Sequence, residues 1–81
     1  MVQITVNING MACSMCESHI NDAVRNTYKV KKVNSSHSKN QTIIVTETDI
    51  ADDSLKFLIE SAGYEFVSAE RSEYKKRGLF G

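Results

Sequence analysis

The spacing of the apolar residues changes along this chain in an order that few folds can accommodate. Residues 1–9 alternate apolar and polar side chains, which is the pattern of a half-buried strand, and Asn9-Gly10 interrupts it. Residues 14–27 space their apolar side chains by three and four, which predicts a helix with one buried face. At its start, Ser14 and Glu17 have the spacing of a capping box, in which both side chains bind backbone N–H groups of the first turn.

The second part of the chain repeats this change of spacing. Residues 30–35 predict a weak strand, and the largely β-branched run TIIVT at 42–46 predicts a strong one. A second helix is predicted from about Ala51 to Ala62, with Gly63 just past its end. A last strand is predicted over residues 64–69.

These elements follow one another in the order βαββαβ. Two helices that each bury one face fit against the same face of a four-stranded antiparallel sheet, so the sequence predicts an α+β fold, the ferredoxin-like sandwich. The inner faces of the helices are expected to consist of Cys16, Ile20, Ala23, Val24 and Thr27 in the first, and Leu55, Leu58, Ile59 and Ala62 in the second. We expect residues 1–70 to form the domain and residues 71–81 to form a solvated C-terminal tail.

Length and charge argue against several classes of protein. A chain of 81 residues buries only about 60% of its unfolded surface, which leaves little room for a deep substrate cavity, so we do not expect an enzyme. Ten acidic residues balance ten basic ones, whereas a nucleic-acid-binding domain normally carries a basic excess. Neither a secretory signal nor an apolar run of roughly 20 residues is visible, so we expect a cytoplasmic protein without a membrane span.

Two cysteines carry the clearest chemical signal. Cys13 and Cys16 stand at the predicted start of the first helix, where the helix dipole and unpaired N–H groups favour thiolates. Two thiolates suit soft ions such as Cu(I), Ag(I), Hg(II) and Zn(II), and Cu(I) and Hg(II) accept two sulfur ligands in a line. Structural zinc needs four ligands, and only His19 and His37 remain as candidates of similar strength. The pair therefore favours an exposed two-sulfur site, from which a partner's cysteine can take the ion.

A CxxC pair also occurs in thiol–disulfide oxidoreductases, which are one alternative. Those folds depend on a cis-proline that faces the active-site disulfide. This chain contains no proline and no tryptophan. The redox interpretation is therefore the weaker one.

The heptapeptide GMACSMC at residues 10–16 resembles the GMxCxxC motif of the heavy-metal-associated domain family. The resemblance covers residues 1–70, includes the triplet AGY that ends at Tyr64, and is nearest to free-standing bacterial copper chaperones. It implies that Cys13 and Cys16 are the metal ligands. It also implies that Met11 is a buried tether under the loop, and that Tyr64 lies beside the loop and shields or tunes the site.

The same resemblance implies a function. A copper chaperone of this family binds one Cu(I) through its CxxC pair and passes it by thiolate exchange to a copper-transporting P-type ATPase. In some bacteria a copper-responsive repressor is a further partner. The sequence leaves open whether Cu(I) bridges a homodimer through four thiolates. A mercuric-ion or general soft-metal-binding protein of the same fold is the main alternative, ahead of the oxidoreductase.

Overall fold

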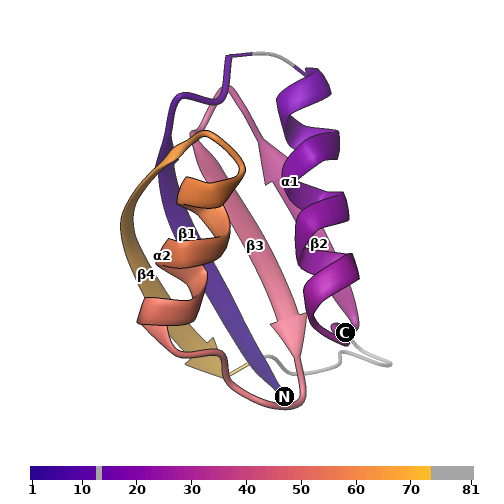
Figure 1. Ribbon diagram of the computed structural model, residues 1–81. Coiled ribbons are helices and arrows are strands. Elements are labelled where there is room, and N and C mark those ends of the chain that lie inside the picture. Colours follow the sequence, from indigo (N-terminus) through magenta and orange to yellow (C-terminus); the bar gives the residue numbers. More distant parts are fainter. Residues whose placement is uncertain (13, 74–81) are drawn as a thin grey trace.

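The computed structural model describes residues 1–12 and 14–73 of the chain, and its element order is βαββαβ, as predicted (Figure 1). The elements are β1 (Val2–Asn9), α1 (Ser14–Thr27), β2 (Lys32–Ser36), β3 (Gln41–Thr46), α2 (Asp52–Ser61) and β4 (Glu65–Glu73). Both helices lie within two residues of their predicted bounds, because alternating and helical spacing are clearly separated in this sequence.

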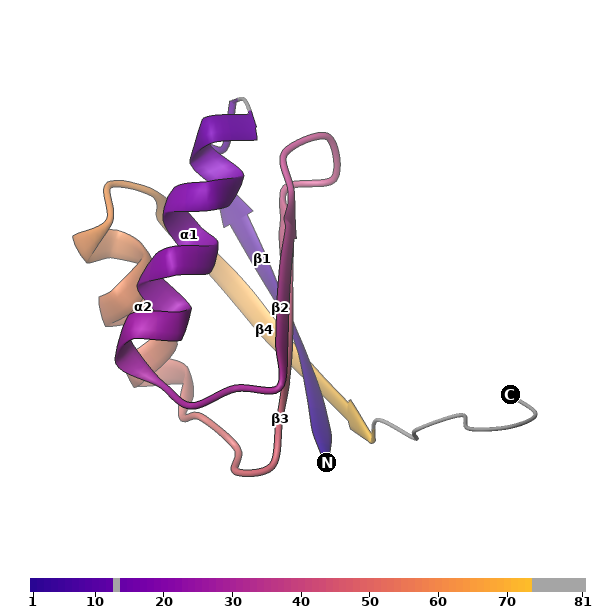
Figure 2. The same ribbon diagram turned by 90° about the vertical axis from the view of Figure 1, so that its right-hand side faces the viewer.

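The four strands form one antiparallel sheet in the order β2-β3-β1-β4. Both helices cover the same face of this sheet, which Figure 2 shows edge-on with the helices on one side. The ferredoxin-like fold class is therefore confirmed. At one end of the sheet, Val2 of β1 lies opposite Glu73 of β4. At the other end lie the connections β1–α1, β2–β3 and α2–β4 (Figure 1).

The core lies between the sheet and the two helices. Its fully buried side chains include Ile4, Val6 and Ile8 of β1, Ile44 of β3, Ile20 and Val24 of α1, and Leu55 and Ile59 of α2. The predicted helix faces were wrong at two positions, Thr27 and Ala62, which are both exposed. Thr27 is the last residue of α1 and Ala62 caps the end of α2, so both stand where the helices stop.

Strand β4 is longer than the sequence predicted. It ends at Glu73 instead of Ala69, and Arg71 pairs with Ile4 of β1 in the antiparallel register. The residues after Ala69 are polar and carry no strand pattern, so only the pairing with β1 extends the strand. Arg71, Ser72 and Glu73, which we expected in the tail, therefore belong to the sheet, whereas the rest of the expected tail lies outside the described residues.

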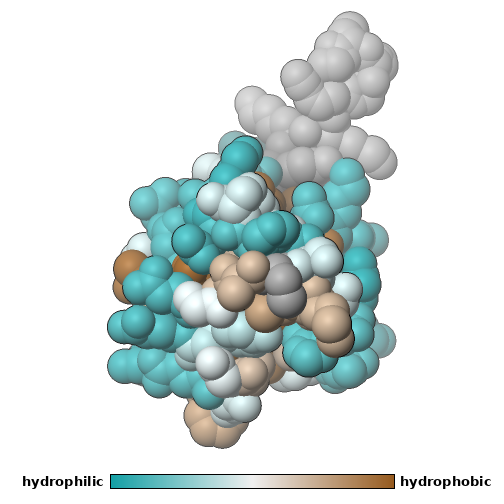
Figure 3. All heavy atoms as spheres, turned by 90° about the horizontal axis from the view of Figure 1, so that it is seen from above, coloured by the Kyte–Doolittle hydropathy of each residue, from teal (hydrophilic) through white to brown (hydrophobic). Residues whose placement is uncertain are grey.

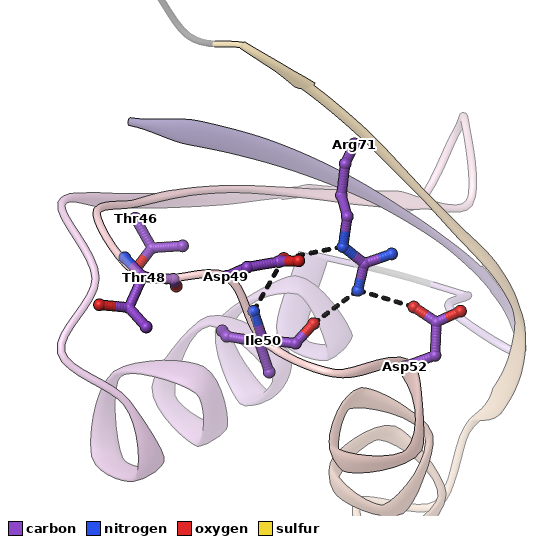
Figure 4. Close-up of polar contacts among 6 residues, drawn as sticks. All are labelled: Thr46, Thr48, Asp49, Ile50, Asp52 and Arg71. Atoms are coloured by element: carbon purple, nitrogen blue, oxygen red, sulfur yellow. Dashed lines mark hydrogen bonds and ion pairs between the residues drawn. The ribbon is translucent and has the colours of Figure 1, made fainter.

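Arg71 also fixes the connection between β3 and α2 (Figure 4). Its Nε donates to Asp49 Oδ1 at 2.7 Å, and its Nη2 lies 2.7 Å from Asp52 Oδ1 and donates to the carbonyl of Ile50. The hydrogen bond from Arg71 holds the pKa of Asp49 below its ordinary value. One guanidinium thus joins β4 to the start of α2.

Neither helix in residues 1–12 and 14–73 is long and apolar enough to cross a bilayer.

Candidate metal centre

The predicted metal loop lies between the end of β1 and the start of α1. Gly10 follows β1 with a φ of 102°, a conformation that side chains rarely tolerate, and this turns the chain toward α1. Met11 is 5% exposed and belongs to the core, whereas Ala12 is exposed. The loop is therefore anchored by a buried side chain two residues before its first cysteine.

Cys16 lies in the first turn of α1, half-buried and packed against the core. A helix start of this kind favours the thiolate over the thiol, because unpaired N–H groups and the helix dipole stabilise an anion there. Cys13, the other predicted ligand, lies outside the described residues. Within the described part of the chain, no three His, Cys, Asp or Glu side chains lie close enough together to hold an ion.

Tyr64 is placed at the loop by the end of α2. Gly63 has a φ of 97°, its N–H donates to the carbonyl of Glu60, and the N–H of Tyr64 donates to the carbonyl of Ile59, each at 3.1 Å. This pair of bonds is a Schellman motif, which ends a helix and reverses the chain. A β-carbon built on Gly10 would lie 3.6 Å from Tyr64 Cδ1, so the aromatic ring lies against the first residue of the loop.

The surface at this end of the molecule is moderately apolar. Seen from above (Figure 3), light-brown residues gather at the centre of this end, and hydrophilic residues surround them. Met15, between the two cysteines in sequence, is 67% exposed. His19, one helical turn past Cys16, is exposed on α1 as predicted. An approaching protein therefore meets a small apolar surface with a polar border.

One contact at this end was not foreseen from the sequence. Glu17 was expected to complete a capping box with Ser14, but its Oε2 accepts a hydrogen bond from the backbone N–H of His37 at 2.8 Å and lies 2.7 Å from His37 Nδ1. Helix α1 begins at Ser14 itself. Two hydrogen bonds from His37 hold the pKa of Glu17 below its ordinary value. The bond from the backbone N–H has the larger effect, and the bond from the ring has the smaller one.

No local sequence signal announces this contact. The two residues are 20 positions apart, and they meet only because the turn after β2 packs beside the first turn of α1.

The sequence is similar to that of one curated protein, the copper-transporting ATPase of Saccharomyces cerevisiae. The two are 29% identical over 65 residues, which are 80% of this chain and 6% of the ATPase. The chain thus spans a small fraction of that relative. No family model matches the sequence.

Solved structures provide closer matches in length. A copper binding domain from HMA7, a P-type ATPase, is similar with a TM-score of 0.72 and 28% identity, covering 90% of this chain and 96% of that domain. The CopZ metallochaperone is similar with a TM-score of 0.70 and 27% identity, covering 80% and 98%. In its fold, its sequence and its motif at residues 10–16, the chain is similar to these copper-binding proteins and resembles the heavy-metal-associated domain family.

Proposed function

We propose that this protein binds one Cu(I) through the thiolates of Cys13 and Cys16 and passes it to a partner protein. The observation that carries the proposal is the place of Cys16, in the first turn of α1 at the end of the molecule where Tyr64 meets Gly10. Similarity to a copper-transporting ATPase, a copper binding domain and a metallochaperone supports it. Met11 would anchor the loop from the core, and Tyr64 would shield it.

Transfer in this scheme is an exchange of ligands. A thiolate of the partner adds to Cu(I), one Cu–S bond to this protein then breaks, and the second follows as the partner's other thiolate binds. The ion keeps its oxidation state, and each released thiolate takes up a proton or stays ionised. No group of this chain has to turn over a substrate, so the protein acts as a carrier and not as an enzyme.

The proposed partner is a metal-binding domain of a copper-transporting P-type ATPase. The support is the likeness of this chain to parts of such ATPases, because donor and acceptor of similar shape can bring two CxxC loops together. We place this exchange in the cytoplasm, where reducing conditions keep both thiols available. A copper-responsive repressor as a further partner and a Cu(I)-bridged homodimer remain predictions.

The test is anaerobic titration with Cu(I) against a competing chelator, with mass spectrometry to count bound ions. We expect one Cu(I) per wild-type chain and none retained by the Cys13→Ala/Cys16→Ala double variant, because the sequence contains no other cysteine. The variant His19→Ala is the matched control and should bind as wild type does.

Unchanged Cu(I) affinity in the double variant would refute the proposed site. Stronger retention of Hg(II) than of Cu(I) under the same competition would favour a mercuric or general soft-metal-binding protein. Turnover of a disulfide substrate with no Cu(I) retained would favour an oxidoreductase.

A further inference from the structure

The turn between β2 and β3 is bonded to both sides of the predicted metal loop. Before the loop, the N–H of Ile8 donates to the carbonyl of Asn40 at 2.9 Å. After the loop, Glu17 receives the two contacts from His37 described above. Because Glu17 directly follows Cys16, this turn links the end of β1 to the helical turn that carries a predicted ligand.

We infer that His37 is a positioning residue for the metal centre. Through Glu17, His37 holds Cys16 at a fixed place relative to the end of β1. This inference rests on the proposed function, since it concerns the same site. The ring of His37 is not proposed as a ligand: Cys16, Glu17 and His37 do not form a three-ligand group in the described structure.

The geometry of the contact favours a firm hold. Both the backbone N–H and Nδ1 of His37 face the same carboxylate oxygen of Glu17, at 2.8 and 2.7 Å. An ionised carboxylate only accepts hydrogen bonds, so Nδ1 carries the proton and donates it. Hydrogen bonds to a charged group are shorter and stronger than neutral ones. The Glu17 side chain is 26% exposed and that of His37 is 42% exposed, so water competes only in part.

A second link lies one helical turn deeper. Ser35 Oγ donates to Asn21 Oδ1 at 2.7 Å and lies 2.8 Å from Thr42 Oγ1. Glu17 and Asn21 are four residues apart on one side of α1, so α1 is held to this hairpin by an inner and an outer link. The inner link is largely buried and lies farther from the loop.

The outer link matters because the first turn of a helix is its weakest part. The first four N–H groups of a helix have no partner inside the helix, so this turn frays readily unless something outside holds it. A site with two sulfur ligands loses affinity when one of them moves out of reach. Removing groups that hold ligands in place typically weakens metal binding by about 10–100-fold.

The experiment compares His37→Ala with three matched variants. His37→Asn keeps a side-chain N–H near the position of Nδ1, His19→Ala removes an exposed histidine elsewhere on α1, and Ser35→Ala breaks the inner link. Each is titrated with Cu(I) against a chelator. Amide hydrogen exchange of residues 14–17 is measured without metal.

We expect His37→Ala to bind Cu(I) about tenfold more weakly and to exchange these amides faster. His37→Asn should restore both, and His19→Ala should match wild type. Ser35→Ala should lower the melting temperature more than His37→Ala does, with a smaller loss of affinity. Wild-type affinity and exchange in His37→Ala would overturn the inference. An equal loss of affinity in Ser35→Ala and His37→Ala would also overturn it, because the effect would then follow stability alone.

The metal-free measurement separates this inference from the proposed function. If the wild-type protein fails to retain Cu(I), the proposed function fails. The exchange rates still decide whether His37 holds the first turn of α1, and equal rates in wild type and His37→Ala would reject that hold as well.

Discussion

Gly63 is the residue on which the position of Tyr64 depends. Its φ of 97° lets Tyr64 donate to the carbonyl of Ile59, and this bond turns the aromatic ring back toward Gly10. A β-carbon at Gly63 would meet nothing within 4 Å, so a substitution there strains the backbone without creating a clash. The glycine is therefore needed for its backbone conformation alone.

We predict that Gly63→Ala destabilises the fold by about 1–2 kcal/mol, the usual cost of a left-handed conformation for a residue with a side chain. Chemical denaturation measures it, and Ser61→Ala, at the exposed last residue of α2, is the control. Asparagine tolerates this region better than alanine, so Gly63→Asn should cost less. Equal stability of Gly63→Ala and wild type would contradict the role assigned to this residue.

The elements themselves were predictable from the sequence to different degrees. Both helices and β1 were found because their apolar spacing and their end residues agree, as Gly63 does with the end of α2. The last residues of β4 were missed because they are polar and lack the alternating pattern of a strand, and the sequence alone does not show that they pair with β1. The contact of Glu17 was missed for a similar reason, since the capping box is a local rule and His37 is a distant partner. The spacing of apolar residues along the chain predicted the helices and strands. Contacts between these elements determined where the polar end of β4 pairs and which partner Glu17 binds.

The contact of Arg71 with the start of α2 should stabilise the packing of β4 against this helix. Exposed ion pairs contribute up to about 1 kcal/mol each and a hydrogen bond to a carbonyl about 1 kcal/mol, so Arg71→Ala should destabilise the fold by about 1–2 kcal/mol. Arg71→Lys keeps the charge but not the planar fork, and should retain only part of the effect. Urea denaturation at neutral pH measures the difference.

The contribution of this contact depends on pH in a defined direction. The pKa of Asp49 is lowered from its ordinary 3.8 because the hydrogen bond from Arg71 in the folded protein stabilises the ionised carboxylate. The stabilisation is thus fully present well above pH 3.8 and is lost as the pH falls through the lowered value. The difference between wild type and Arg71→Ala should therefore shrink in acid, and a difference that grows there would contradict it.

The whole molecule depends on a single thin core between the sheet and two helices. Domains of this size bury only about 60% of their unfolded surface, so each fully buried side chain supplies a large share of the net stability. Leu55 of α2 is fully buried, whereas Leu58, on the same helix, is only partly buried. The two leucines therefore offer the same chemistry at different depths.

We predict that Leu55→Ala destabilises the protein by about 2–5 kcal/mol, the range for a buried leucine that leaves a cavity. Leu58→Ala, in the same helix, should cost clearly less. Thermal or chemical unfolding of both variants makes the comparison. A similar cost for both would mean that burial at the centre of the core does not decide the stability of this domain.

The pairing of Val2 with Glu73 has a consequence for how such a module can be tethered. Strand β1 begins and strand β4 ends at the pole of the molecule opposite Gly10, Cys16 and Tyr64. A neighbouring domain joined to the start of β1 or to the end of β4 would therefore be attached at that pole. The end of the molecule that carries Cys16 would then stay open to an approaching protein.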